Sequence, residues 1–424
     1  LTYSLHPIYR DYALSSTPQG SSLDTDSAFT RYILNKRMAD YHVARRKPQA
    51  DWKTIDDVAS QLREIEYRYN CGDYDAIILI FETIAQQHLF YWGYVDLVID
   101  WLLRLKELVK NDEILLKIHS ILIIGYWHLV NYQQSLHHAQ IALSMAEKQK
   151  NQSAESRILG NIAALHYARG KIEEAVVYIE RAIKIAEETN NRPIQAIQHG
   201  NLGGIYYSLG EFEKAIESYV KSLEISRELD DKLNQSRQLV NLGEVMSTLK
   251  RPDEALPYLI ESIRIAQELN STSMLQNNWI FLARAYFLFG DFPKGLVAIH
   301  QALNLDHDNP DRGHYGMILY GCLSWCSGHI EKATEIFHDT VKLTDAVLAI
   351  ASDNFEALYS RALALTGLWI AKGDITYHQQ AISAYQTAVQ IGGMKGTLFD
   401  KRQLLEALLA CSDKDGAELL ALLA

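Results

Sequence analysis

The chain has few basic residues for its size and few prolines. Its 41 Lys and Arg face 52 Asp and Glu, giving a net charge of -11, and its densest basic cluster is Arg45-Arg46-Lys47. Contacts to phosphates need clustered cations, so we expect no nucleic-acid partner. Only eight of the 424 residues are proline, while 48% are hydrophobic and 22% charged, a balance that excludes disorder and supplies a buried core.

Cysteine is also sparse. The sequence has no dense, even-numbered cysteine framework of the kind that stabilises small secreted domains. We therefore expect free thiols and a reducing, cytoplasmic compartment. The four cysteines are Cys71, Cys322, Cys326 and Cys411.

Apolar runs are short. None reaches the ~18 residues that a membrane helix needs, and the best candidates, 76–84 and 114–127, are cut short by charged or polar residues. Residues 1–13 lack the cationic start and the apolar stretch of a signal peptide. These absences predict a soluble protein without a membrane partner. The first residue is Leu1 rather than Met, so we expect the chain to be a piece of something longer.

Motifs of catalysis and cofactor binding are absent too. There is no Gly-x-x-x-x-Gly-Lys-Ser/Thr loop to hold a triphosphate, no Gly-x-Ser-x-Gly run and no His-Glu-x-x-His run. Among the 15 histidines, His137 and His138 are adjacent and so point to different faces of a helix. Cys322, Cys326 and His329 could supply three metal ligands, but they lack a fourth and fit core positions. We expect no enzyme, no catalytic residue, no cofactor and no metal.

What the sequence does contain is an internal repeat. Three segments align without gaps at a period of 40 residues, and the pattern returns in three further copies, two of them weaker. Each copy has apolar residues at three- and four-residue spacing on both sides of a short turn, which is typical of a hairpin of two amphipathic helices. The copies are 159–175, 199–215 and 239–255, then 279–295, 319–333 and 119–135. The predicted turn residues are Val130, Gly170, Gly210, Lys250, Gly290, Gly328 and Gly373.

Small residues recur where two helices must approach closely. No single hairpin can bury both of its faces, so the hairpins must stack, and stacking of one hand produces a superhelix with a concave inner wall. The small positions are Ala163, Gly203, Gly243 and Ala283 before the turn, Ala175, Ala215, Ala255 and Gly295 after it, and Ala182, Ser222, Ser262 and Ala302 further along.

This repeat resembles the tetratricopeptide repeat, in the longer variety of about 40 residues found in large sensor and adaptor proteins. The resemblance implies an all-α, right-handed superhelical solenoid of antiparallel helix pairs. We expect regular repeats over 151–305 and diverged repeats with a C-terminal cap, residues 398–424, over 306–424. A helical spacer and diverged hairpins are expected over 31–150.

A second resemblance concerns the amino-terminal side. The run Leu5-His6-Pro7-Ile8-Tyr9-Arg10-Asp11-Tyr12 resembles the end of the winged-helix region in signal-transduction ATPases of the NB-ARC or NACHT kind. Residues 67–93 resemble the helical spacer that leads into the repeats of such bacterial proteins. Residues 1–30 would then be the end of a winged-helix-like region plus a linker. The alternative for residues 5–12 is an ordinary short helix that docks on the first hairpin.

The inner wall supplies the candidate binding residues. The first helix of each hairpin should line it, and residues 13, 9, 6 and 3 places before the turn share one stripe. Asn side chains can hold an extended peptide backbone, Arg binds carboxylates, and aromatic rings anchor apolar groups. The predicted groove residues are Arg157, Asn161, Tyr167, Asn201, Tyr207, Arg237, Asn241, Glu244, Asn277, Arg284 and Phe287.

Other roles for these residues stay open. The Asn side chains could bond the backbone of the neighbouring hairpin, Tyr167 and Tyr207 could be plain lining, and the Arg side chains could be solvated surface charges.

Two functions fit the sequence. The first is a module that binds a protein or peptide in its concave groove and couples recognition to an amino-terminal ATPase of the STAND type, with a possible oligomer when the two parts are joined. The second is a passive scaffold or adaptor without a switch. The sequence does not identify the partner.

Overall fold

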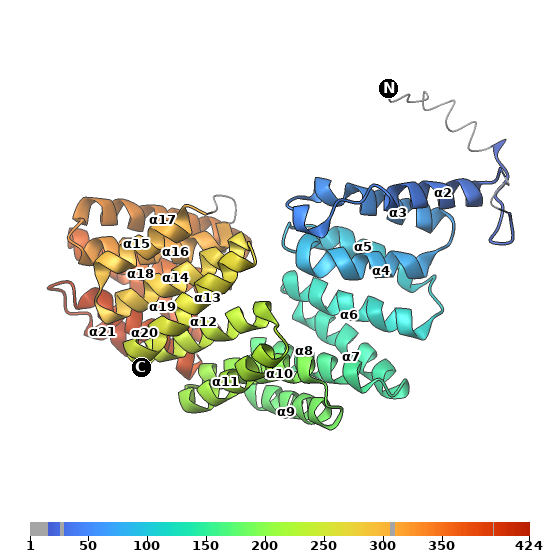
Figure 1. The fold of residues 1–424 in the computed structure, drawn as a ribbon. Helices are drawn as coiled ribbons and strands as arrows, with labels where there is room; N and C mark the ends of the chain where they lie inside the picture. The colour runs from blue at the N-terminus through green and yellow to red at the C-terminus, as the bar shows by residue number, and fades with distance from the viewer. Residues whose placement is uncertain (1–15, 26–28, 306–309, 393) are drawn as a thin grey trace. The chain divides into compact units, whose positions relative to one another are not determined.

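The computed structural model describes residues 16–25, 29–305, 310–392 and 394–424. All regular elements within these ranges are helices (Figure 1). The chain divides into two units, Leu1–Leu165 and His166–Ala424, and the boundary falls inside α8 (Gln152–Ala168). The run from residue 5 to residue 12, which resembles a winged-helix end, lies outside the described residues.

The first unit is built from helices of unequal length. Helix α2 packs on α3, and α6 packs on α7. A short π-helical turn, Ala85–Leu89, follows α4. The helices of this unit are α2 (Arg31–Val43), α3 (Ala59–Asn70), α4 (Tyr74–Ile84), α5 (Val95–Lys106), α6 (Asp112–His128) and α7 (Tyr132–Lys148), followed by most of α8, with two short 3-10 turns at Gln49–Asp51 and Ile55–Val58.

The second unit is a run of helix pairs. In each pair the two helices pack on each other, and successive pairs stack in sequence order. The pairs are α10 (Arg192–Leu209) with α11 (Phe212–Glu228), α12 (Lys232–Thr248) with α13 (Pro252–Glu268), α14 (Thr272–Phe289) with α15 (Phe292–Leu303), α16 (Pro310–Cys326) with α17 (Ile330–Ile350), and α18 (Phe355–Lys372) with α19 (Ile375–Gly392). Helix α9 (Ile172–Glu188) precedes them, and α20 (Lys395–Leu409) and α21 (Ala417–Ala421) follow. The predicted all-α solenoid of helical repeats is confirmed.

The turns explain why each hairpin closes where it does. All seven predicted turn residues have positive φ, from 56° at Lys250 to 81° at Gly328. This left-handed conformation ends a helix and favours glycine. A second series with positive φ, Lys150, Asn190, Asp230 and Asn270, joins one pair to the next at the same period of 40 residues.

The small residues lie where helices approach closely, as predicted. A Cβ atom on Gly203 would come within 2.6 Å of the Tyr219 ring, and one on Gly243 within 2.5 Å of Leu259. Both contacts join the first helix of a pair to the second. A larger side chain at either glycine would therefore separate the pair.

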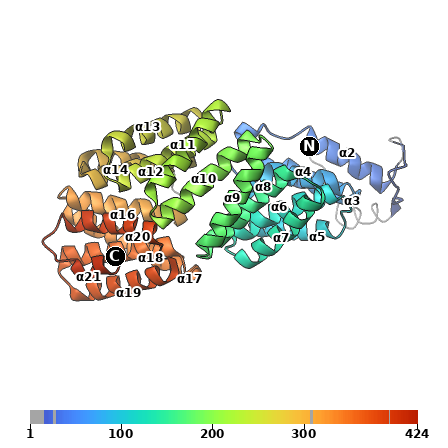
Figure 2. The same ribbon diagram turned by 90° about the horizontal axis from the view of Figure 1, so that it is seen from below.

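Helix α20 differs from the cap that the sequence predicted for residues 398–424. It contacts α10, α14 and α18, which are the first helices of three different pairs. Helix α21 packs on α19, the second helix of the last pair. In Figure 2, α20 lies among these first helices. The leucines that indicated a cap, such as Leu404 and Leu408, are instead buried in the core of the second unit.

The expectation of four free thiols is wrong for two of them. Cys326, at the end of α16, forms a disulfide with Cys411, just beyond α20, and their Cα atoms are 5.4 Å apart. Cys71 and Cys322 are free. The sequence separation of 85 residues hid this pair. The expectation of a reducing compartment rested on the sparse cysteines, and the disulfide does not support it.

Among the helices of the described residues, none combines the length and the hydrophobicity needed to cross a membrane.

Candidate functional site

The candidate site is the inner wall of the second unit, which we define as the face of α10, α12, α14 and α18 that meets α20. Helix α20 covers the C-terminal parts of α10, α12 and α14 and the N-terminal part of α18. A Cβ on Gly396 of α20 would overlap the carbonyl oxygen of Tyr207 and lie 2.7 Å from the Gly210 amide nitrogen. Only a glycine lets the backbone of α20 approach the end of α10 this closely.

A buried ion pair holds the middle of α20 to the wall. Asp400 pairs with Arg284 of α14, whose side chain is fully buried. Thr248 of α12 completes the contact, because its Oγ1 lies 3.1 Å from Asp400 Oδ1 and 3.2 Å from Arg284 Nη2. Nε and Nη1 of Arg284 have no partner among the described residues. Asp400 is therefore the ion-pair partner of this buried cation.

Lys401, the next residue of α20, makes a second charged contact. Its Nζ lies 2.7 Å from Glu356 Oε2 of α18 and over the rings of Tyr315 and Tyr359, at 5.1 and 5.9 Å. Burial is the largest influence on the pKa of Lys401 and lowers it, but Glu356 and Tyr315 outweigh it and raise the pKa above its usual value. The ammonium group therefore stays charged.

The carboxyl-terminal end of α20 is held by the Cys326–Cys411 disulfide and by a hydrogen bond. Trp325 Nε1 of α16 donates to the Cys411 carbonyl oxygen at 3.0 Å. Toward the other end, the ring of Phe399 is tilted against that of Phe212 of α11, with ring centroids 5.6 Å apart. Helix α20 is thus fixed along its length.

The N-terminal and middle parts of α10 and α12 remain open. Asn201 and Arg237 are exposed, and Asn241 is half-buried. Ile197 is 41% exposed and Leu233 48%, which is high for large apolar side chains. We call these five residues the open stripe. They lie one or more helical turns before the part of each helix that α20 covers.

The predicted groove residues separate into several groups in the structure. Asn201, Arg237 and Asn241 belong to the open stripe, and Asn277 is half-buried on α14. Arg157, exposed, and Asn161, half-buried, are in the first unit. One alternative for the Asn side chains was a hydrogen bond to the neighbouring hairpin. The described contacts of Asn201 and Asn241 differ from it, because each side chain donates to a Gln one turn earlier on its own helix, at 3.2 Å.

Three other predicted residues lie at the covered end. The hydroxyl groups of Tyr167 and Ser208 share a hydrogen bond, and that of Tyr207 lies 3.3 Å from Thr248 Oγ1. Burial raises the pKa of both tyrosines. Burial also raises the pKa of Glu244 above its usual value, although Arg284 and Lys401 lower it.

Two predictions need correction. Arg284 is neither a solvated charge nor a free guanidinium, because it is fully buried against Asp400 of the same chain. Phe287 is 1% exposed and belongs to the core, with Phe292 as its ring neighbour at 6.1 Å. Both residues lie in the last two turns of α14, where the wall is closed by packing.

Sequence reasoning missed the residues of α20 that face the wall. Gly396, Asp400 and Lys401 lie more than 100 residues from Arg284 and Thr248. The only local indication is the run of four polar residues, 400–403, between Leu398 and Leu404 of a leucine-rich helix.

The candidate metal ligands that the sequence offered do not come together as a site in the described part of the chain. Cys326 is in a disulfide, so the set of Cys322, Cys326 and His329 does not form a site. No group of three metal-binding side chains occurs among the described residues. His138 instead contacts His119 of α6, with 2.9 Å between the Nδ1 atoms, and burial lowers the pKa of each to about 4.

Two family models match the chain. Both are described as tetratricopeptide repeat, and they match residues 157–193 and 194–268. The sequence matches no curated protein closely enough to count as a relative.

Several solved structures are similar in fold. A STAND protein with a tetratricopeptide repeat sensor, from Pyrococcus horikoshii, has 15% identity and a TM-score of 0.59 over 92% of this chain. This chain spans 55% of that protein. The apo form of RapI has 15% identity and a TM-score of 0.54, covering 79% of this chain and 99% of RapI. A Rap protein complexed with competence and sporulation factor has 12% identity and a TM-score of 0.55, and the match covers 87% of this chain and 99% of that protein.

At these identities the similar structures bear on the fold alone. The residues that the two family models match run from within α8 to the end of α13. Residues 157–268 therefore match the tetratricopeptide repeat, and they belong to an all-α solenoid whose fold resembles that of a STAND protein with a repeat sensor.

Proposed function

We propose that the chain is a protein- or peptide-binding module and that its partner binds at the open stripe. The observation that carries the proposal is the contrast along the inner wall. Helix α20 fills the C-terminal end of the wall, whereas Ile197 and Leu233 stay exposed beside Asn201 and Arg237 at the other end. Exposed apolar side chains next to amide and guanidinium groups form the kind of surface on which a peptide is held.

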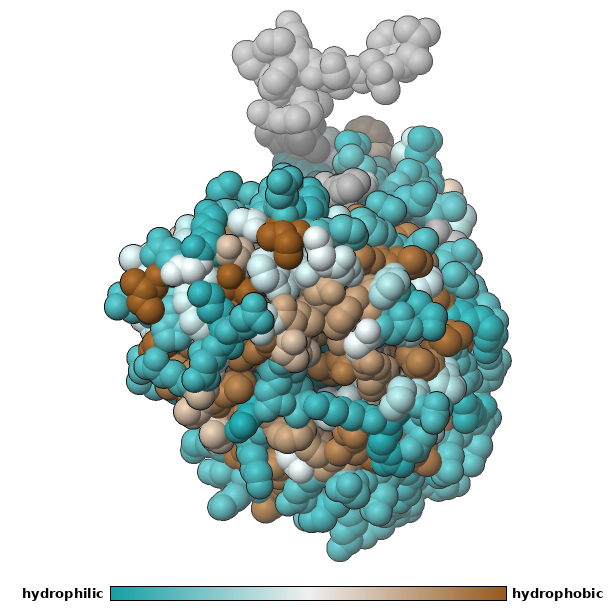
Figure 3. Space-filling model, turned by 90° about the vertical axis from the view of Figure 1, so that its left-hand side faces the viewer, coloured by the Kyte–Doolittle hydropathy of each residue, from teal (hydrophilic) through white to brown (hydrophobic). Residues whose placement is uncertain are grey.

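Three further points support a protein partner. Repeat stacks present extended surfaces that other proteins bind. Figure 3 shows the face of the molecule on the side of α15–α21 in Figure 1, where hydrophobic residues gather in a central area surrounded by hydrophilic ones. One of the similar Rap structures is a complex with competence and sporulation factor, which supports a peptide or small protein as the class of partner.

We further propose that this module is the sensor part of a STAND-type ATPase, in which partner binding favours the active state. The support is the similarity in fold to the STAND protein, of which this chain spans 55%. The coding sequence upstream of Leu1 tests this step. A phosphate-binding loop there supports the sensor, and a start codon close to Leu1 contradicts it.

The alternative is a passive scaffold, and one observation favours it. The disulfide and the buried Arg284–Asp400 pair fix α20 to the wall, so the covered end has no evident moving part. A scaffold would bind its partner with the same affinity whatever the nucleotide state of an attached ATPase.

A triple alanine variant tests the binding surface. Partners cross-linked to the full chain are identified first, and the Kd of each is then measured for Asn201→Ala, Arg237→Ala and Asn241→Ala combined. We expect a loss of roughly tenfold or more, because these side chains supply the polar contacts of the open stripe. The matched control replaces exposed Glu217 and Arg264 on the second helices and should bind as the wild type does. Equal binding by the triple variant would remove the open stripe as the site.

A further inference from the structure

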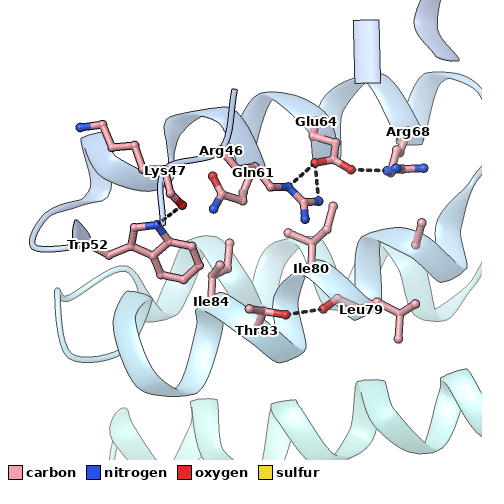
Figure 4. A pocket seen from close by; sticks show the side chains of 11 residues that line it. Arg46, Lys47, Trp52, Gln61, Glu64, Arg68, Leu79, Ile80, Thr83 and Ile84 are labelled. Atoms are coloured by element: carbon pink, nitrogen blue, oxygen red, sulfur yellow. Dashed lines mark hydrogen bonds and ion pairs between the residues drawn. The ribbon is translucent and has the colours of Figure 1, made fainter. Parts of the chain in front are cut away.

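The first unit has a cavity of its own. It measures ≈ 330 Å³ and lies between α3, α4 and the segment that joins α2 to α3 (Figure 4). Its floor is apolar and comes from α4, chiefly Leu79, Ile80 and Ile84. Its size is within the range of small-ligand sites, which runs from about 300 to 1,000 Å³.

Gln61 of α3 is the unusual residue in this cavity. Its side chain is 2% exposed, and neither Oε1 nor Nε2 has a hydrogen-bond partner among the described residues. Figure 4 shows the amide in the space between Trp52 and Arg46. A buried amide without a partner is unfavourable, and native proteins seldom leave both of its atoms unpaired. A single partner for both atoms would supply one acceptor and one donor side by side.

The charged groups around Gln61 are already paired with one another. Glu64 is fully buried and accepts from Arg46 Nη2 at 2.5 Å and from Arg68 Nε at 2.6 Å. Arg68 also contacts Asp73 at 2.5 Å, and Lys47 contacts Asp57 at 2.5 Å. With Asp57 and Asp73 included, three cations balance three anions. The cavity therefore favours an uncharged ligand.

The remaining polar groups of the cavity are also used. Trp52 Nε1 donates to the Lys47 carbonyl oxygen at 3.0 Å, and Thr83 Oγ1 donates to the Leu79 carbonyl oxygen at 3.1 Å. Trp52 can therefore contact a ligand only through the face of its ring. The amide of Gln61 is the polar group of the cavity that can still form hydrogen bonds.

We propose that this cavity binds an uncharged amide whose N–H and C=O pair with Gln61 and whose apolar body lies against Trp52, Ile80 and Ile84. An N–H and a C=O of this kind occur together both in a small carboxamide and in the backbone of a peptide. The site is independent of the inner wall and of the function proposed for it.

Titration of the full chain with N-acetyl-L-leucinamide tests the site, observed through the labelled methyl groups of isoleucine. We expect shifts of the Ile80 and Ile84 signals that saturate at millimolar ligand, and binding at least about tenfold weaker for methyl isocaproate, which keeps the apolar body but has no N–H. No shift at these two residues, or equal binding of the ester, overturns the proposal.

Gln61→Leu separates a binding role from a structural one. It should weaken binding roughly tenfold or more and raise the melting temperature, because an apolar group replaces an unpaired amide. A lowered melting temperature would mean that the amide already has a partner, and would overturn the proposal. The control is Gln403→Leu, which removes another buried Gln whose Oε1 lacks a partner, in the second unit, and should leave binding unchanged.

A capped tripeptide, acetyl-Ala-Leu-Ala-amide, identifies the source of the ligand. Tighter binding than N-acetyl-L-leucinamide supports the site as one for a peptide segment. Exclusion of the tripeptide while the small amide binds supports it as a site for a small molecule. Failure of both probes overturns the site but leaves the open stripe untouched.

Discussion

The two ends of the inner wall differ although they are built by the same helices. In the N-terminal and middle parts of α10 and α12, Asn201 and Arg237 are exposed. At the C-terminal end, Arg284 is fully buried against Asp400, and Gly396 touches the Tyr207 backbone. The repeat thus sets where side chains point, while a distant segment decides which of them meet solvent. Polar residues on the same stripe therefore have different roles.

Among the changes that test this contrast, loss of the buried carboxylate of Asp400 should change the free energy of unfolding most. Asp400→Ala leaves Arg284 buried without its main partner, which should lower the free energy of unfolding by about 3–5 kcal/mol. Urea unfolding of the second unit measures the loss. The double variant Arg284→Met with Asp400→Leu should recover most of it, since apolar pairs can replace buried ion pairs. A small effect of Asp400→Ala would show that the pair is not closed as described.

A methyl group at the close contact between Gly396 and the Tyr207 backbone should have the next largest effect on stability. Gly396→Ala places a Cβ on the Tyr207 carbonyl oxygen and should cost about 1–3 kcal/mol, the scale of overpacking. Gly204→Ala makes the same change on α10, where the new Cβ meets only the Tyr219 hydroxyl at 3.7 Å. We expect this control to be neutral or up to about 1 kcal/mol more stable, because Ala favours helix. Hydrogen exchange at α20 should rise only in Gly396→Ala.

Glu244 lies where the two ends meet and gives a pH test. Burial raises its pKa in the folded chain, so the folded state holds this proton to a higher pH than the unfolded state does. The stabilisation is fully present below the unfolded pKa and is lost as pH rises through the folded pKa. Glu244→Gln should therefore be more stable than the wild type at pH 7, by less than the two changes above. The difference should vanish toward the unfolded pKa near 4.5. A gain that does not depend on pH would contradict this account.

Substitutions at the turn residues should change the stability least. Lys250 has φ of 56°, a left-handed conformation that costs less for glycine, so Lys250→Gly should add roughly 0.5–1 kcal/mol of stability. Gly210→Ala, at φ of 77° in the preceding hairpin, should lose a similar amount. Thermal unfolding of the two variants measures both. Changes of the same sign would mean that packing outweighs backbone conformation at these turns.

Much of the fold could be predicted from local pattern. Gly203 and Gly243 recur at a period of 40 residues, and both prove to be close helix contacts. The seven turn residues could be predicted for the same reason, because each hairpin needs a residue with positive φ at its turn. Asn201 and Arg237 on the candidate surface followed from helical spacing alone.

Other features could not be predicted in this way. The pairing of Cys326 with Cys411 depends on where α20 returns, and so does the burial of Arg284. The unpaired amide of Gln61 appears only when α3 and α4 are placed together. None of these features repeats along the chain, so periodicity gives no information about them.

The sequence by itself determined the helix pairs, their turns and the stripe on which polar residues lie, because each follows from interactions between residues close together in the chain. The tertiary structure alone decided which part of that stripe is open. That outcome depends on contacts of α20 with helices more than 100 residues away, at Tyr207, Thr248 and Arg284, and local physical chemistry does not determine contacts at such a distance.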